Sequence, residues 1–523
     1  MKSPVINDGN DQASEISDVP ADFERAISLT GHGKFNYLLL LAIVPTSWAA
    51  VYSSSSMSYI LPSTECDLQF TDLEKGMLTS MPSADNRRDG SGVFSMRMVI
   101  MSLVWGFIID AFGRRKIIVY GSLCFAINTL ASTFSQTSWQ LIIFKFIDGV
   151  VMSGPYAALQ SYLAEVHSEH NRSRIYMCVG MVIAVGNISL PCLAWLVIPR
   201  KWPLSDWVEI TSWRLFLGFT SLPGLAAGFA FYFFPESPRF LLATRRHDSA
   251  LEVYKQIYSL NTGKHPDTYP VASLEEEDTI KIQGVTFKET LKGCCKQIQP
   301  IFMPPNVVNL VLTSAIQCGA TLGSNTLRLW MPMVFAVLET YEQAHLGGPS
   351  TTICYKIGNA GFVNGTASEV VHCSNVVNDT VYTNSIVISV ATVIGYIIAR
   401  SLVNAIGKRI LMGICFFGAG CCCGALYWAR NSNEILAIAS VFVALTSIGG
   451  TIVNNFVVDV FPTTLRAMAL SGTTIIGRMG AFVGNLVFPI LFSLDCLAPF
   501  IMIGSACLMC ALLVLVLPRK TKG

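Results

Sequence analysis

The sequence predicts an all-α membrane protein with twelve transmembrane helices in two pseudo-symmetric six-helix bundles. Three observations predict this fold. Hydrophobic residues make up 52% of the 523 residues and charged residues only 13%, whereas a soluble protein carries roughly 25% charged residues. Apolar runs long enough to cross about 30 Å of hydrocarbon recur along the chain. Short charged motifs also repeat at one fixed offset between the two halves.

The apolar runs are expected to be helices, because lipid offers no hydrogen-bond partner to an open backbone. In the first half they lie near residues 37–61, 93–110, 117–134, 139–162, 175–198 and 214–234. In the second half they lie near 306–337, 384–403, 409–428, 434–457, 468–492 and 497–517. The predicted domains are therefore a tail (1–36), a first bundle (37–234), a polar linker with short helices (235–305), a second bundle (306–517) and a short tail (518–523).

Basic residues in the short loops predict the orientation of the bundles. Arg114 to Lys116, Arg172 with Arg174, Lys408 with Arg409, and Arg519 with Lys520 all fall on one side of the membrane. Basic residues concentrate in cytoplasmic loops. This side, the linker 235–305 and both termini are therefore expected to be cytosolic.

The loop 338–383 then lies outside, and two of its features agree with that position. It carries N-glycosylation sequons at Asn364 and Asn378. Cys354 and Cys373 in the same loop would meet an oxidising compartment, where they could form a disulfide. Most of the other cysteines lie inside apolar segments, where a cysteine acts as a small hydrophobic residue.

The repeated motifs are separated by 294 residues. Gly113 follows the second span and Gly407 follows the eighth, and 407 − 113 = 294. The same offset separates two further pairs after spans four and ten: Glu165 from Asp459, and Arg172 from Arg466. Internal duplication of this kind predicts two halves with equivalent structures.

These repeated charges have two interpretations. A Gly-Arg-Arg turn lets the chain reverse at the membrane surface while the guanidinium groups of Arg114 and Arg115 stay in water. Acids at the ends of neighbouring helices can pair with them. Pairs that form only when the halves close on the cytosolic side would favour an outward-open state. Alternatively, the basic residues fix the topology and have no gating role.

Four segments carry a resemblance to a known family: Gly106–Lys116, Glu165 with Arg172, Pro235–Arg239, and Asp459–Arg466. They resemble the sugar-porter and organic-ion branch of the major facilitator superfamily. Within that branch, Ile60–Ser63, Cys66–Leu68 and the sequon-bearing loop look most like synaptic vesicle glycoprotein 2 and its relatives.

The resemblance covers nearly the whole chain from about residue 30. It implies the major facilitator fold, in the plasma membrane or an intracellular vesicle membrane. It also implies transport of a small-molecule solute by alternating access, linked to a proton or another ion. The cytosolic charge network that it implies comprises Asp110, Gly113, Arg114, Arg115, Glu165, Arg172, Glu236, Arg239, Asp459 and Arg466.

The sequence departs from the family pattern at several positions. Ala111 stands where the motif is usually basic, and Asn404 replaces an Asp in the second copy. Residues 36–62 carry no charge, whereas relatives have acidic residues there that suit proton coupling. Residues 82–97 stand where the family is already inside span two, and are either a lengthened loop or an error in the gene product.

Charged and polar residues inside the spans are the candidates for the substrate cavity, because a charge within a span is costly unless it faces a cavity or a partner. They are Lys145, Asp148, Gln317, Asn325, Arg328 and Arg478. Lys145 and Asp148 share one helix face and can neutralise each other, or they line the cavity. Arg328 and Arg478 each offer a planar fork for a carboxylate or phosphate, although Arg328 can instead extend to the surface. Together the two arginines favour an anionic or zwitterionic solute.

The sequence excludes some classes of function and ranks others. It contains no basic stripe interleaved with aromatic residues, the pattern that would indicate nucleic-acid binding. No catalytic arrangement, cofactor fingerprint or metal-ligand cluster is readable, so we expect no enzyme activity, cofactor or metal. The leading hypothesis is a secondary active transporter of a small polar organic solute, either an organic ion or a sugar-like molecule. The alternative is a vesicle or surface glycoprotein that keeps the fold and acts as a binding partner or receptor.

Overall fold

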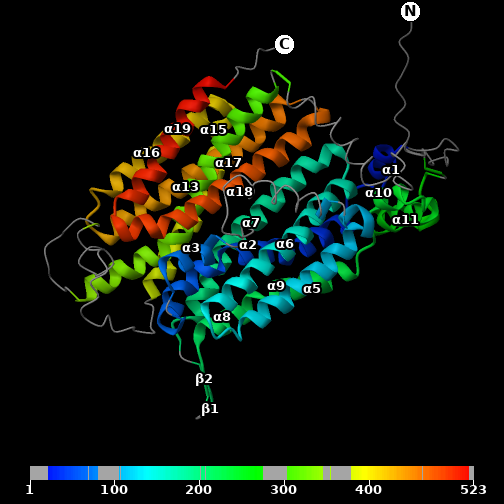
Figure 1. Cartoon of the computed structure of the whole chain (residues 1–523). Coiled ribbons are helices and arrows are strands. Elements are labelled where there is room, and N and C mark those ends of the chain that lie inside the picture. The colour runs from blue at the N-terminus through cyan, green and yellow to red at the C-terminus, as the bar shows by residue number, and fades with distance from the viewer. Residues whose placement is uncertain are drawn as a thin grey trace, which may run out of the picture.

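The computed structural model describes residues 22–68, 70–80, 105–106, 108–200, 202–205, 208–271, 273–274, 303–304, 306–344, 354, 379–461 and 463–517. These residues are almost entirely helical (Figure 1). Ten of their helical segments are long and apolar enough to cross a membrane. The segment 82–97 and most of the predicted second span, 93–110, lie outside the described residues, but 108–110 at the end of that span are helical.

The described part of the first half has helices at five of the six predicted spans and a further helix, α3, that the sequence did not suggest. Its helices are α2 (Lys34–Leu68), α3 (Asp72–Ser80), α5 (Arg114–Ser132), α6 (Ser138–Val166), α7 (Glu169–Val197), α8 (Ser212–Thr220) and α9 (Leu222–Tyr232). Ser221, between α8 and α9, divides the predicted sixth span into two short helices. A small antiparallel hairpin that the sequence did not suggest, β1 (Trp202–Ser205) with β2 (Val208–Ile210), protrudes between α7 and α8 (Figure 1).

The second half contains α13 (Asn306–Ala344), α15 (Asp379–Ile406), α16 (Lys408–Leu426), α17 (Ser432–Val460), α18 (Thr463–Leu494) and α19 (Ala498–Val516). These helices pack mainly on one another. Contacts of α2 with α13, α7 with α15, and α3 with α18 join the two halves.

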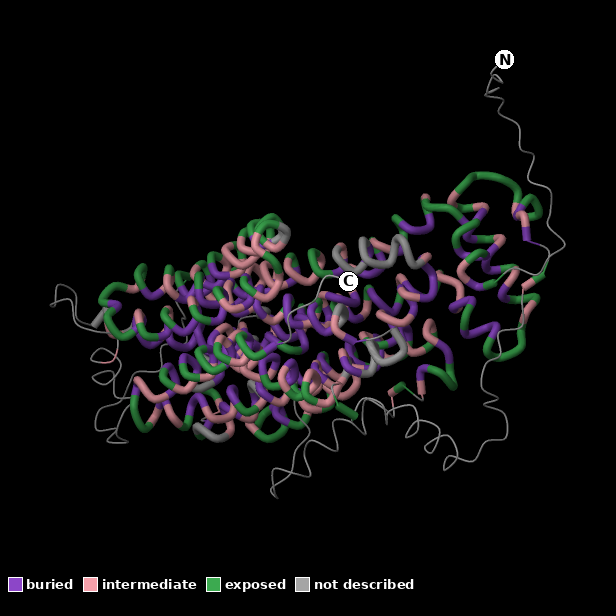
Figure 2. The backbone as a smooth tube through the Cα atoms, turned by 90° about the horizontal axis from the view of Figure 1, so that it is seen from above, coloured by how far each residue is buried: buried purple, intermediate pink, exposed green. Residues whose placement is uncertain are grey.

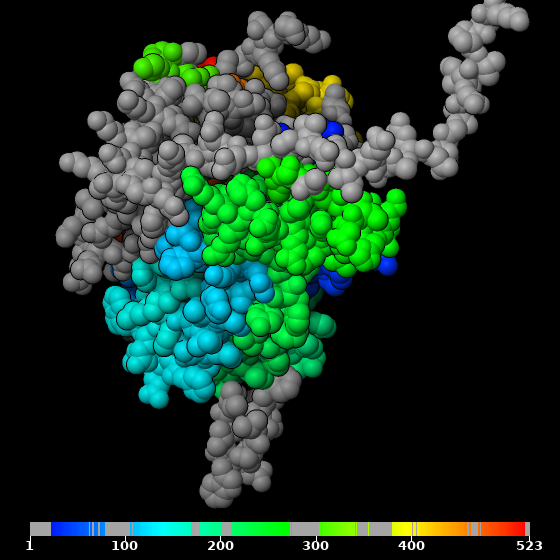
Figure 3. Space-filling view, turned by 90° about the vertical axis from the view of Figure 1, so that its right-hand side faces the viewer, coloured from blue at the N-terminus to red at the C-terminus, as the bar shows by residue number. Residues whose placement is uncertain are grey.

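The start of the segment 235–305 is helical. It forms α10 (Pro238–Ala243), α11 (His247–Thr262) and the 3-10 turn η2 (Pro266–Thr268), which pack on α1 (Phe23–Leu29). In Figure 3 the green surface of this linker segment lies against the blue and cyan surface of the first half. Asn261 of α11 donates to the carbonyl oxygens of Thr30 and Gly31 and accepts from the amide of Phe35. These bonds hold the beginning of α2 against the linker.

The offset of 294 residues is visible in the helix boundaries. Both α5 and α16 are 19 residues long, and both α6 and α17 are 29 residues long. The second helix of each pair starts and ends 294 residues after the first (408 − 114 = 294; 432 − 138 = 294). The glycines before α5 and α16 have φ values of 96° and 84°, a conformation that favours glycine. The duplication seen in the motifs therefore extends to the helices themselves.

The hydrophobic cores differ between the two ends of the molecule. We call the end that carries α10 and α11 the inner end, and the opposite end, where α6, α15 and α17 begin, the outer end. At the outer end one core cluster contains residues of both halves, including Tyr59, Leu61, Leu327 and Trp330. At the inner end the described residues form separate clusters, one in the first half and two in the second.

This difference defines the state of the structure. The buried residues in Figure 2 run along the interior of the bundles and into the α1–α11 unit at the right. Among the described residues, one apolar cluster joins the two halves at the outer end, and the clusters at the inner end each belong to a single half. In the predicted orientation this is an inward-facing arrangement.

Glycines allow α18 to pack closely on α13. A Cβ atom on Gly477 would lie 2.8 Å from Cγ of Gln317, and one on Gly480 would lie 2.8 Å from Sγ of Cys318. Thr321 Oγ1 also donates to the carbonyl oxygen of Gly477 at 2.5 Å. Small residues permit such close contact between membrane helices. Gln317, a candidate cavity residue, is thus part of the contact between α13 and α18.

Candidate functional site

A buried ion pair lies at the inner end of the first half. Arg114, the first residue of α5, places Nη2 3.1 Å from Oε1 of Glu165 on α6 and 2.8 Å from Oδ1 of Asp110. The other Glu165 oxygen accepts from Ser237 Oγ at 2.5 Å. The side chains of Arg114 and Glu165 are only 12% and 8% exposed, whereas that of Asp110 is 58% exposed. The strong part of the network is therefore the contact of Arg114, Glu165 and Ser237.

Glu236 closes the turn before α5. Its Oε1 accepts from the backbone amides of Arg115 at 2.9 Å and Ser237 at 3.0 Å. A carboxylate at this place satisfies a free amide at the helix start and favours the helix dipole. A Cβ atom on Gly113 would lie 2.5 Å from Glu236 Oε2, so the fit requires glycine for space as well as for its φ angle.

Two other predicted arginines contact aromatic rings and backbone. Arg115 lies over the ring of Tyr232 at 5.7 Å and donates to its carbonyl oxygen. Arg239 of α10 lies over the ring of Phe23 at 5.6 Å. The guanidinium groups thereby hold the end of α9 and the helix α1 against this network.

The structure describes only part of the second copy of this charge network, which lies in the second half. Arg409 donates from Nε to the carbonyl oxygen of Val514 at 3.0 Å, as Arg115 does to the end of α9. A Cβ atom on Gly407 would meet nothing within 4 Å. The side chains of Arg172, Asp459 and Arg466 lie outside the described residues, although their backbones are helical in α7, α17 and α18.

The contacts of the described network stay within the first half and the linker. Arg114, Glu165 and Glu236 join α5, α6 and the turn before α10, and none of their described contacts reaches the second half. These pairs therefore exist while the inner ends of the halves are apart. The expectation that they form only on cytosolic closure does not hold for them, because both partners belong to one rigid half.

This geometry predicts that the two carboxylates that pair with Arg114 contribute unequally to stability. Glu165→Ala leaves a largely buried guanidinium without its main partner and is expected to lower the free energy of unfolding by about 3 kcal/mol. Asp110→Ala removes an exposed partner and should cost less than about 1 kcal/mol. Thermal unfolding of the detergent-purified variants measures the difference. Equal losses for both variants would contradict the assignment of Glu165 as the main partner.

Lys145 and Asp148 form the self-neutralised pair that the sequence left as one of two options. Lys145 Nζ lies 2.8 Å from Asp148 Oδ2, and the two side chains are 1% and 0% exposed. Asp148 Oδ1 accepts from Asn128 Nδ2 at 2.7 Å and Thr129 Oγ1 at 3.0 Å. Both oxygens of the Asp148 carboxylate thus have partners on α5 or α6. The pair holds these helices together, and its burial places it outside any open cavity in this state.

Arg328 lies between the two halves. From α13 its Nη1 donates to Oδ1 of Asn187 on α7 at 3.1 Å, and its Nη2 donates to Oδ1 of Asn325 at 3.1 Å. Ser389 of α15 donates to the carbonyl oxygen of Asn187. Arg328 does not extend to the surface, because its donors are directed at side chains of both halves. Sequence reasoning missed Asn187; the only available signal was an uncharged polar residue in an apolar run.

Arg478 lies on α18 of the second half. Its side chain is exposed, and its charge acts on the hydroxyl of Tyr156 on α6 of the other half. The structure thus places Arg328 and Asn325 at a contact between the two halves, whereas Lys145, Asp148 and Gln317 take part in contacts between helices of one half.

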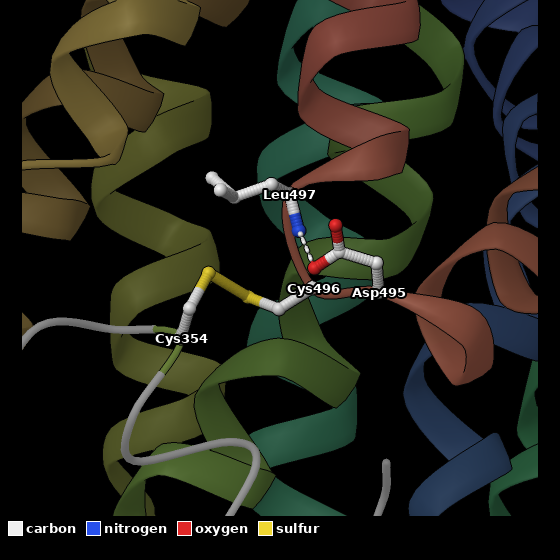
Figure 4. Close-up of a disulfide and its surroundings, with 4 residues drawn as sticks. All are labelled: Cys354, Asp495, Cys496 and Leu497. Carbon is white, nitrogen blue, oxygen red and sulfur yellow. Dashed lines mark hydrogen bonds between the residues drawn. A yellow bond between two sulfur atoms is a disulfide. The ribbon is translucent and has the colours of Figure 1, made fainter. Parts of the chain in front are cut away.

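The outer loop is attached by a disulfide that differs from the predicted one. Cys354 pairs with Cys496, in the connection of α18 and α19, with a Cα–Cα distance of 5.5 Å (Figure 4). Asp495 Oδ1 accepts the amide of Leu497 beside it at 3.2 Å. The predicted Cys354–Cys373 bridge is wrong, because the fold brings Cys496 next to the loop. Cys373, Asn364 and Asn378 lie outside the described residues.

Peptide mapping checks this correction. Digestion of the purified protein without reductant is expected to release one linked peptide that contains Cys354 and Cys496. Reduction should separate the two parts, and Cys496→Ser should remove the linked species without removing other bridges. A linked peptide that contains Cys354 and Cys373 would contradict the structure.

Two family models match the chain. Residues 78–338 match "Sugar (and other) transporter", and residues 376–523 match "Major Facilitator Superfamily". The chain belongs to the major facilitator superfamily. Membership confirms the predicted fold of two six-helix bundles and a multi-pass membrane protein, and it points to a family of transporters and not of enzymes.

Curated relatives of this superfamily member include synaptic vesicle glycoproteins. Mouse synaptic vesicle glycoprotein 2C is 22% identical over 608 residues, which cover 97% of this chain and 81% of the relative. Rat synaptic vesicle glycoprotein 2B is 22% identical over 597 residues, which cover 95% and 85%. The similarity therefore extends over nearly the whole chain, as the motifs predicted.

Solved structures of the superfamily are also similar. The partially occluded inward-open xylose transporter XylE of E. coli gives a TM-score of 0.63 at 15% identity, covering 93% of this chain and 98% of that one. A D-xylose-proton symporter gives 0.62 at 16% identity, covering 94% and 99%. At such identities the similarity shows the fold.

Proposed function

We propose that this protein is a secondary active transporter that moves a small polar organic solute across a membrane by alternating access. The observation that supports the proposal most is the arrangement of the cores. One apolar core joins the halves at the outer end, and separate cores fill each half at the inner end. Halves that are rigid and share a limited contact can rock about it.

Polar groups between the halves support a solute site there. Arg328 on α13 and Asn187 on α7 meet at the interface, and Arg478 on α18 interacts electrostatically with Tyr156 of the first half. Such groups are costly in a membrane span and usually line a solute path. The rigid networks of Glu165 and of Asp148 keep each helix group intact during the movement.

The membrane and the coupling ion are part of the proposal. The similarity to synaptic vesicle glycoproteins supports a vesicle membrane, with the inner end and both termini in the cytosol. A proton is the first coupling ion to test, because one structural relative is named a proton symporter. The segment 36–62 of the first span carries no charge, so a carboxylate that carries the proton would have to lie outside this segment.

Uptake into proteoliposomes tests the proposal. Radiolabelled or mass-detected sugars, organic cations and organic anions are offered with and without an imposed pH gradient, against protein-free liposomes. We expect uptake of one solute class above the protein-free control, and its abolition when an ionophore removes the driving gradient. Absence of flux from folded, glycosylated protein would overturn the proposal and favour a binding glycoprotein with the transporter fold.

A further inference from the structure

Arg328, a cation between the halves, differs from Lys145 and Arg114 in its hydrogen-bond partners. Lys145 has a carboxylate at 2.8 Å, and Arg114 has Glu165 at 3.1 Å. Arg328 has only two amide oxygens, and in the described part of the chain no carboxylate lies within 4 Å of it. Its Nε is buried without a hydrogen-bond partner among those residues. A partly buried cation without a carboxylate partner is unfavourable.

The surroundings of Arg328 are polar but uncharged. The hydroxyls of Tyr59 on α2 and Tyr396 on α15 lie close enough to interact electrostatically with its guanidinium. Tyr52 and Ser189 share a hydrogen bond of 2.8 Å between α2 and α7. Among the described residues, the guanidinium group of Arg328 therefore has hydroxyl neighbours from both halves.

Asn187 occupies one branch of the guanidinium fork. Its Oδ1 lies 3.1 Å from Nη1, and its Nδ2 donates to the carbonyl oxygen of Ile183 in its own helix. A carboxylate or phosphate presents two oxygens in the plane that this fork favours, and it binds more strongly than an amide oxygen. An anion can therefore displace the amide of Asn187.

We infer that Arg328 binds the oxyanion group of the transported solute and that Asn187 takes the place of this group in the empty protein. The inference rests on the proposed transport function and narrows its solute class to small organic anions. Asn187 belongs to α7 and Arg328 to α13, so displacement of the amide breaks a hydrogen bond between the halves. Binding of the anion thereby releases one contact that holds the empty state together.

The first test needs no knowledge of the solute. Asn187→Asp places a carboxylate where the amide now contacts Nη1 and is expected to raise the thermal unfolding temperature. The increase must depend on the arginine, so the Asn187→Asp/Arg328→Gln double variant should lose it. Asn187→Ala is the matched control and should not raise the temperature. An increase that persists without Arg328, or no increase at all, would overturn the inference.

The second test measures selectivity by proteoliposome uptake. The probes are three scaffolds in neutral, anionic and cationic forms: glucose, glucuronate and glucosamine; benzyl alcohol, benzoate and benzylamine; glycerol, lactate and ethanolamine. Glucose 6-phosphate separates phosphate from carboxylate recognition. We expect uptake of an anionic member to exceed that of its neutral and cationic counterparts. Arg328→Gln should reduce that uptake about 10- to 100-fold.

The variants separate a substrate contact from a structural role. Arg328→Lys keeps the charge but loses the fork, and it should raise the KM for the anion while leaving the expression level and unfolding temperature near those of the wild type. Asn187→Asp should abolish anion uptake. Uptake of neutral or cationic probes that is insensitive to Arg328→Gln would overturn this inference and leave the transport proposal intact. No uptake of any probe would count against the transport proposal itself.

Discussion

Asp148→Ala is expected to cost the folded protein about 3–5 kcal/mol, the typical loss when one member of a buried ion pair is removed. The substitution leaves the ammonium group of Lys145, which is 1% exposed, without its carboxylate. It also removes the acceptor of Asn128 and Thr129. The measurement is the unfolding temperature of the purified variant, together with its yield of monodisperse protein.

A double variant is the matched control for this prediction. Lys145→Met with Asp148→Leu removes both charges at similar volume, and such replacement of a buried pair is often close to neutral. We expect it to recover much of the stability, with a remaining deficit from Asn128 and Thr129. A double variant as unstable as Asp148→Ala would show that the loss does not arise from the unpaired lysine.

Gly480→Ala is expected to destabilise the second half by about 1–3 kcal/mol, the usual range for overpacking of a tight contact. The added Cβ would meet the carbonyl group of Cys318, whose carbon would be 2.9 Å away. This backbone atom cannot move unless α13 and α18 separate. Separation would also lengthen the hydrogen bond from Thr321 to the carbonyl oxygen of Gly477.

Gly472 on the same helix is the control. A Cβ atom there would have only Leu310 Cδ1 as a neighbour, at 4.0 Å, so Gly472→Ala should be neutral or slightly stabilising because alanine favours the helix. Thermal unfolding of the two variants under identical conditions gives the comparison. Similar unfolding temperatures would contradict the close α13–α18 packing.

The sequence predicted the fold well because the fold depends on local and periodic signals. Apolar runs place the helices, and the Gly113 and Gly407 turns mark the starts of α5 and α16. The i,i+3 spacing of Lys145 and Asp148 predicted their pairing as one of two options, since it needs only one helix.

Contacts between distant segments could not be predicted in the same way. Arg328 and Asn187 are 141 residues apart, and Cys354 and Cys496 are 142 apart. The nearer Cys373 was chosen because the sequence carries no measure of spatial distance. For the same reason, only the structure shows whether a charge network lies within one half or joins the two halves.

Two pairs of equivalent surface positions test the central claim, that the two halves rock about the interface. Gln136 and Arg430 are exposed at the outer end, Lys116 and Ile410 are exposed at the inner end, and each pair is related by the 294-residue offset. Spin labels on unnatural amino acids at these positions, which avoid the native cysteines, give both distances by pulsed electron resonance. We predict a short outer and a long inner distance without solute. The solute found in the uptake screen should lengthen the outer distance and shorten the inner one. Distances that stay fixed, or that change in the same direction, would contradict the account.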